Sequence, residues 1–221
     1  MRRYSLLLLK VLVFSLNSLA QSSFELGFLP SINLNKRLPQ DWSLNLKTES
    51  RQSIAKQEFS YEYLLTDISI AASKKIGINT SIAIGYLARV DENSLKNRAM
   101  QQITFIKRYP GFRLAHRLLT DQTFAKDDDA EFRLRYRISS EIPLQGSSLD
   151  PKEFFAKLSN EYLNSLQGKS YDMEIRWASF IGYAISPANK IELGFDYRID
   201  SFIEGSSRNR VWLSLNFYTS I

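Results

Sequence analysis

Charged side chains that recur at every second or fourth position are the groups in this sequence best suited to chemistry. Arg113, Arg117 and Asp121 follow one another at a spacing of four. Side chains alternate between the two faces of a β-strand, so these three would share one face. Charged groups on one face can form ion pairs or line a polar passage. We predict a shared polar interior for Arg113, Arg117, Asp121, Lys157, Glu161, Glu174, Arg176, Asp196 and Arg198.

His116 is the only histidine of the chain, and histidine is the side chain most often used as a general base. Histidine activates hydroxyl nucleophiles, and some lipid hydrolases place such a pair on a strand surface that faces lipid. The hydroxyl on the same predicted face is that of Thr120, while Ser139 and Ser140 belong to the next predicted strand. No serine stands two residues from His116. We therefore interpret His116 as a polar wall residue and keep catalysis as the alternative.

Metal ligands are scarce in this chain. It has no cysteine and one histidine, so only carboxylates remain. Asp127, Asp128 and Asp129 could bind calcium, but such a run is more typical of a solvated loop. We expect no metal site and no cofactor. The absence of cysteine also excludes a disulfide framework.

The elements that carry the charged residues are predicted to be long β-strands. Residues 77–90 keep a two-residue rhythm throughout. Strands of soluble domains usually have about five or six residues, whereas a tilted strand needs about 9–11 to cross a bilayer. Similar alternation predicts strands at 24–37, 42–52, 58–73, 77–90, 98–108, 112–125, 130–143, 153–164, 171–185, 190–202 and 208–221.

This pattern predicts an all-β fold, an antiparallel transmembrane up-and-down β-barrel. Bacterial single-chain barrels have even strand numbers. We therefore expect about twelve strands, with Pro30 dividing the first segment, and ten as the alternative. Short turns are expected at 38–41, 74–76, 109–111 and 186–189, and longer loops at 91–97, 126–129, 165–170 and 203–207. The stretch 146–151 is expected to be an exception, long on the side of the short turns.

The strand over residues 130–143 shows which face meets lipid. Arg133, Arg135 and Arg137 alternate with apolar or aromatic residues. An arginine on the lipid face near the midplane costs about 2–4 kcal/mol. The arginines must therefore point inward, and Phe132 and its neighbours on the other face must point outward. A soluble β-sandwich would reverse this arrangement, but it explains such long strands poorly.

The N-terminus is typical of an exported protein. A basic start, an apolar run and the small residues Ser18 and Ala20 are the layout of a signal peptide. We predict a signal peptide over residues 1–20, cleaved after Ala20, and one barrel domain over residues 21–221. An uncleaved anchor is the alternative. No later apolar stretch approaches the 18 or so residues of a membrane-spanning helix.

The net charge of +6 includes three basic residues of the predicted signal peptide, which leaves about +3 on the mature chain. These charges alternate in sign and form no basic stripe, so a nucleic-acid partner is not expected. The expected location is the outer membrane of a Gram-negative cell. The expected partners are its lipid and the barrel-assembly machinery, which would read the strand from Val211 to Ile221. We expect a monomer.

Four segments resemble a family of Bacteroidota outer-membrane barrels whose activity is unknown. They are "AHRLLTDQTF" (115–124), "LSNEYLN" (158–164), "RWASFIGYAI" (176–185) and "IELGFDYR" (191–198). The family pattern carries further charges after the His-Arg pair, where this chain has Leu119 and Thr123. The resemblance implies a barrel in the outer membrane and brings no activity with it.

Two functions follow from a charged barrel interior. The ion pairs can close the interior and leave a structural protein, or water can fill it and let small solutes pass. A barrel of about eight strands is filled by its side chains, while 16–18 strands leave a channel, so ten or twelve does not decide. We predict a non-enzymatic outer-membrane barrel, a small-solute pore or a structural barrel, with a lipid-modifying hydrolase as the alternative.

Overall fold

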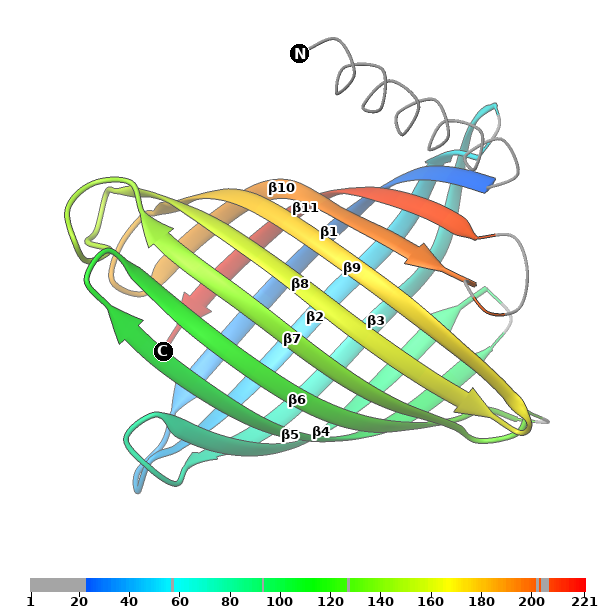
Figure 1. Ribbon diagram of the computed structural model, residues 1–221, viewed down its shortest axis with the longest axis horizontal. Coiled ribbons are helices and arrows are strands. Elements are labelled where there is room, and N and C mark those ends of the chain that lie inside the picture. Colours follow the sequence, from blue (N-terminus) through cyan, green and yellow to red (C-terminus); the bar gives the residue numbers. More distant parts are fainter. Residues whose placement is uncertain (1–22, 57, 93, 127, 202, 204–206) are drawn as a thin grey trace, which may run out of the picture.

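The computed structural model describes residues 23–56, 58–92, 94–126, 128–201, 203 and 207–221. These residues form a closed barrel of eleven strands (Figure 1). No helix in this part of the chain is long and apolar enough to cross a membrane. The strands are β1 (Ser23–Arg37), β2 (Trp42–Ala55), β3 (Phe59–Lys75), β4 (Thr80–Asp91), β5 (Leu95–Tyr109), β6 (Phe112–Phe124), β7 (Glu131–Pro143), β8 (Phe154–Gln167), β9 (Ser170–Ala184), β10 (Asn189–Asp200) and β11 (Arg208–Ser220).

The strand topology confirms the predicted up-and-down barrel but not an even strand count. Consecutive strands pair antiparallel, and β1 closes the barrel by pairing parallel with β11. An even number is required only when the closing pair is antiparallel as well. Pro30 does not divide β1. Pro30 has no partner on β2, because the β1–β2 pairing skips from Phe28 to Ser31. The N–H that proline lacks therefore removes no hydrogen bond from that pairing.

The parallel seam places the start of β1 and the end of β11 at opposite ends of the barrel (Figure 1). We call these the N-terminal end and the C-terminal end. The connections at the C-terminal end are 38–41, 76–79, 110–111, 144–153 and 185–188. Those at the N-terminal end are 56–58, 92–94, 125–130, 168–169 and 201–207.

The expected contrast between one end with short turns and one with long loops is absent. The longest connection, 144–153, lies at the C-terminal end. The polar stretches 91–97 and 165–170 mostly continue the strands, because Asn97 still pairs with Phe124 and Gln167 pairs with Ser170. The two-residue turn between Gln167 and Ser170 requires a left-handed backbone conformation, which Gly168 adopts with φ of +57°.

On β7 the outward side chains are apolar or aromatic and the arginines point inward, as predicted. Phe132, Leu134 and Tyr136 are exposed, while the side chains of Arg133 and Arg135 are only 9% and 13% exposed. This confirms the predicted faces of this strand.

Exposed aromatic residues occur near both ends of the barrel, among them Phe24 and Phe132 near the N-terminal end and Trp42 and Phe112 near the C-terminal end. The rings of Tyr109 and Phe112 stack 4.6 Å apart. The ammonium groups of Lys107 and Lys74 lie 5.1 and 5.3 Å from the rings of Tyr109 and Trp42. Aromatic rings and long basic side chains of this kind are typical of a membrane–water boundary.

Two glycines let large aromatic side chains enter the barrel interior. Phe155, on β8, is fully buried and lies directly opposite Gly182 of β9. A Cβ atom at position 182 would lie 2.2 Å from the Phe155 ring. Trp212, 1% exposed, covers Gly27 across the β1–β11 seam in the same way. Each aromatic ring thus occupies the space that a side chain on the next strand would fill.

Replacing Gly182 by alanine is expected to lower the free energy of unfolding by about 1–3 kcal/mol, because the new methyl group overlaps a buried ring. Urea unfolding in detergent, followed by the heat-dependent gel shift of barrels, measures this. Gly77→Ala is the control, since the nearest atom to a Cβ there is 3.8 Å away. Equal effects of the two substitutions would contradict the packing of Phe155 on Gly182.

Candidate functional site

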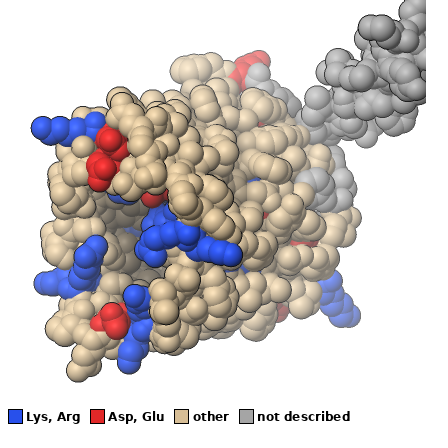
Figure 2. Space-filling view, turned by 60° about the vertical axis from the view of Figure 1, so that its left-hand side comes forward, with Lys and Arg blue, Asp and Glu red and all other residues tan. Residues whose placement is uncertain are grey.

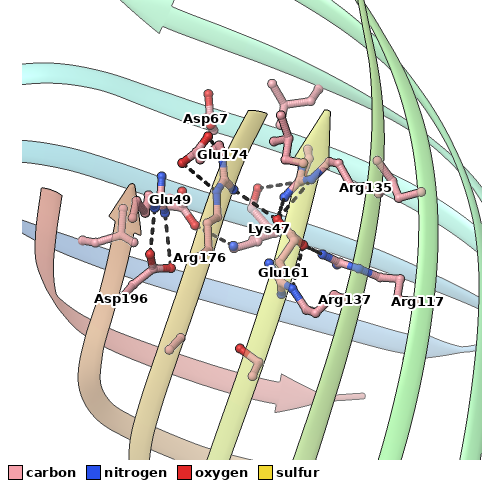
Figure 3. Close-up of a pocket in the computed structure, with 18 of the residues that line it drawn as sticks. Lys47, Glu49, Asp67, Arg117, Arg135, Arg137, Glu161, Glu174, Arg176 and Asp196 are labelled. Atoms are coloured by element: carbon pink, nitrogen blue, oxygen red, sulfur yellow. Dashed lines mark hydrogen bonds and ion pairs between the residues drawn. The ribbon is translucent and has the colours of Figure 1, made fainter. Parts of the chain in front are cut away.

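A charged cavity of about 590 Å³ occupies the barrel interior. It extends from Asn45 and Tyr218 near the C-terminal end to Asp200 and Arg208 at the N-terminal end. Figure 3 shows charged side chains from opposite walls pointing into it. Alternation explains this arrangement, since each strand that presents apolar residues to the outside presents its intervening residues to the cavity.

Glu161, on β8, is the centre of the charge network, and its side chain is 1% exposed. Its oxygen Oε2 accepts hydrogen bonds from Arg117 at 2.8 Å and Arg137 at 2.7 Å. Its oxygen Oε1 accepts from Arg135 at 2.6 Å and Arg176 at 3.3 Å. Four guanidinium groups from β6, β7 and β9 therefore converge on one carboxylate (Figure 3).

Bridging arginines extend this network around the wall. Arg135 also lies 3.8 Å from Asp121, which is fully buried and accepts a hydrogen bond from Arg133 at 2.6 Å. Arg176 also donates to Glu174 at 2.8 Å. These bridges join charges of four neighbouring strands into one ladder of alternating sign.

The opposite wall carries a second group of charges on β2, β3 and β4. Glu49 accepts from Lys47 at 2.7 Å and from Arg51 at 3.0 Å. Asp67 accepts two hydrogen bonds from Arg89, both at 2.7 Å. Arg51 lies 3.6 Å from Asp67 and so connects the two carboxylates.

The predicted site residues fall into several separate contacts. Arg113, Arg117 and Asp121 share a strand face but not a partner, because Arg113 binds Glu141 at 3.3 Å and the other two bind different groups. The remaining contacts are Arg198 with Asp196 at 2.7 Å, Lys157 with Glu192 at 2.8 Å, and Arg176 with both Glu161 and Glu174. Asp196 thus bonds Arg198, its neighbour on the same face of β10.

Four interior charges were missed by the sequence analysis: Arg51, Asp67, Arg89 and Arg98. Arg133, Arg135 and Arg137 were predicted to point inward but were not included in the predicted site. Alternation could have found the missed residues as well. Arg89, for instance, lies between the outward residues of the regular segment 77–90. Arg51 likewise continues the alternation of Lys47 and Glu49, and the β2–β3 register shifts only after it.

The cavity carries an excess of positive charge. Thirteen lysine and arginine side chains line it, against eight of aspartate and glutamate. Two further carboxylates, those of Asp121 and Glu192, pair with lining residues. Counting them leaves an excess of three positive charges in the interior.

His116 lies on the outer wall, where its Nδ1 atom is 2.8 Å from the phenol oxygen of Tyr136. The hydroxyl of Thr120 instead donates to the side chain of Gln101 at 2.9 Å. Ser139 lines the cavity, on the other side of the wall. Within the described residues, His116 is therefore not hydrogen-bonded to a serine or threonine hydroxyl.

Metal ligands are not clustered in the described part of the chain, where no three His, Cys, Asp or Glu residues could hold an ion together. Of the aspartate run, Asp127 lies outside the described residues. The backbone oxygen of Asp129 accepts a hydrogen bond from Gln167 at 3.0 Å.

The model of one protein family, described as "Protein of unknown function (DUF2490)", matches residues 26–220, which is nearly the whole barrel. The chain belongs to the DUF2490 family. The match confirms the predicted membership of a family of unknown function. No curated protein and no solved structure matches this DUF2490 chain.

Replacing Glu161 by glutamine is expected to lower the free energy of unfolding by about 3–5 kcal/mol, because buried arginines lose their shared counter-charge. Urea unfolding in detergent measures the change. Glu62→Gln removes an exposed pair with Lys56, whose side chains are 49% and 48% exposed, and should cost about 0–1 kcal/mol. A cost for Glu161→Gln no larger than that of this control would refute the central role of Glu161.

Proposed function

We propose that this DUF2490 protein is an outer-membrane β-barrel of a Gram-negative bacterium whose water-filled interior passes small solutes, anions in preference to cations. The observation that carries the proposal is the cavity, with its excess of three positive charges. Fixed positive charges in a narrow aqueous passage raise the local concentration of anions. They also repel cations.

Partial exposure of the interior charges supports water in the cavity. The side chains of Lys47, Arg137 and Lys157 are 36%, 34% and 26% exposed. Burying such charges without full pairing costs several kcal/mol each. Water that reaches them removes much of this cost, whereas a dry plug would require a carboxylate for every base.

Basic residues at the C-terminal end of the barrel support anion entry. They stand in pairs where β1, β3 and β5 end: Lys36 and Arg37, Lys74 and Lys75, and Lys107 and Arg108. Within the described residues none of the six takes part in an ion pair. Figure 2, which turns this end forward, shows Lys and Arg side chains beside a hollow in the surface. Such a charge distribution draws anions toward the opening.

The apolar outer wall and its aromatic residues support a membrane location, with outer-membrane lipid as the surrounding partner. We further propose that the barrel-assembly machinery reads β11 and the final Ile221, and that the barrel is a monomer. We propose no catalytic role for His116, since its partner is the phenol of Tyr136 and not a serine or threonine hydroxyl.

Expression in a Gram-negative host should place the protein in the outer-membrane fraction, because the outer wall is apolar and the N-terminus is typical of a signal peptide. Intact mass should show a mature chain that begins at Gln21, a position outside the described residues. The same chain without residues 1–20 is the control and should stay in the cytoplasm. Recovery of the full chain as a soluble periplasmic protein would refute the proposed location.

Refolded protein in a planar bilayer should give discrete current steps, because water and ions can enter the charged cavity. In a potassium chloride gradient the reversal potential should show preference for chloride. Arg137→Glu changes the charge of a partly exposed lining residue by two units and should reduce this preference. Glu62→Gln, outside the cavity, is the matched control. A silent bilayer with folded protein, or preference for potassium, would contradict the proposal.

A further inference from the structure

Arg117 and Arg137 differ from the other arginines around Glu161, because neither has a second carboxylate. They lie directly opposite each other on β6 and β7. Within the described residues, the one carboxylate to which each is hydrogen-bonded is Glu161, through its oxygen Oε2, at 2.8 and 2.7 Å. Arg135 and Arg176 share the other oxygen and also reach Asp121 and Glu174. The local excess of positive charge therefore falls on Arg117 and Arg137.

These two guanidinium groups also face the cavity more openly than the others. Their side chains are 26% and 34% exposed, against 13% for Arg135 and 14% for Arg176. A guanidinium has five N–H donors in a planar fork, and each of the two uses one on Glu161. Like charges directly opposite on neighbouring strands destabilise a sheet, so an anion between them would relieve repulsion.

Two hydroxyl groups lie next to this pair on the side of the C-terminal end. Ser139 is the next inward residue after Arg137 on β7, and Ser159 lies directly opposite it on β8. Both line the cavity. In the part of the chain that the structure describes, neither hydroxyl has a hydrogen-bond partner. The nearest ammonium group along β8, that of Lys157, is held by both oxygens of Glu192 at 2.8 and 3.0 Å.

We propose that Arg117, Arg137, Ser139 and Ser159 form a binding site for a tetrahedral oxyanion of the phosphate or sulfate class. Arginine forks match the geometry of such oxyanions and donate two hydrogen bonds at once. Hydroxyl donors complete the shell around the remaining oxygens. Glu161 does not compete, because it is 1% exposed and saturated by guanidinium donors. This site rests on the proposed function, which supplies the aqueous route to it.

The test is calorimetric titration of inorganic phosphate into the full chain, refolded in zwitterionic detergent at low ionic strength. We expect one saturable site per barrel, with sulfate as a competitor. Arg117→Gln and Arg137→Gln should each weaken binding at least about tenfold, because each removes charge-assisted hydrogen bonds. Arg208→Gln is the matched control. Arg208 also lines the cavity, but it stands at the start of β11, away from the proposed site, and is paired with Asp200 at 2.9 Å, so its loss should leave the affinity unchanged.

The heat-dependent gel shift shows which variants fold. Ser139→Ala keeps every charge and decides the case if an arginine variant does not fold: weaker phosphate binding supports the site, and unchanged affinity overturns it. Absence of saturable binding to the folded wild type overturns the site, as does an equal loss in Arg137→Gln and Arg208→Gln.

Calorimetry in detergent does not depend on conduction, so the two proposals can fail separately. Saturable phosphate binding by a barrel that is silent in the bilayer supports the oxyanion site and refutes the passage. Chloride conduction by a barrel that binds no phosphate overturns the site and leaves the passage standing. Block of the chloride current by phosphate, lost in Arg137→Gln, supports both.

Discussion

The convergence of four arginines on the carboxylate of Glu161 is the interaction on which the barrel interior depends. The four arginines come from the strands β6, β7 and β9, which surround β8 and Glu161. Backbone hydrogen bonds and the stagger of the strands set the width of a barrel, whereas side chains that bond from strand to strand determine how its interior is filled. Glu161 also offsets the desolvation cost of the buried arginines, because an unpaired charge in the barrel interior would cost several kcal/mol.

The parallel β1–β11 seam is the second structural constraint. It permits an odd strand count and places the first and last strand ends at opposite ends of the barrel. The interior side of this seam holds few charges: Gly27, Leu29 and Ser31 from β1 face Trp212 and Ser214 from β11. The aromatic ring of Trp212 fills space over Gly27. The charge network therefore borders a seam that is packed by ring and backbone contacts.

Alternation in the sequence was enough to predict the barrel, its strand positions and the inward face of β7, because a wall one strand thick turns alternate side chains to an apolar outside and a charged inside. It could not predict the parallel seam, since no local pattern records which strands meet at closure. The partners in the ion pairs could not be predicted from the sequence either. Arg117 and Asp121 look like partners at a spacing of four, yet neighbouring strands bring each a closer opposite charge, Glu161 and Arg133. Register between strands decides the ion pairs, and a single sequence does not contain it.

The ion pairs of the interior are compatible with the proposed solute passage, because the exposed charges are mostly positive and the buried ones mostly negative. Asp121 and Glu161 are fully or almost fully buried and accept hydrogen bonds from the arginines around them. Arg117, Arg137 and Lys157 reach further into the cavity, with larger exposed fractions. Each of these two carboxylates thus pairs with several basic side chains at the wall, while the surplus positive charge faces the cavity. A barrel built in this way gains its rigidity from the same arginines that would attract an anion.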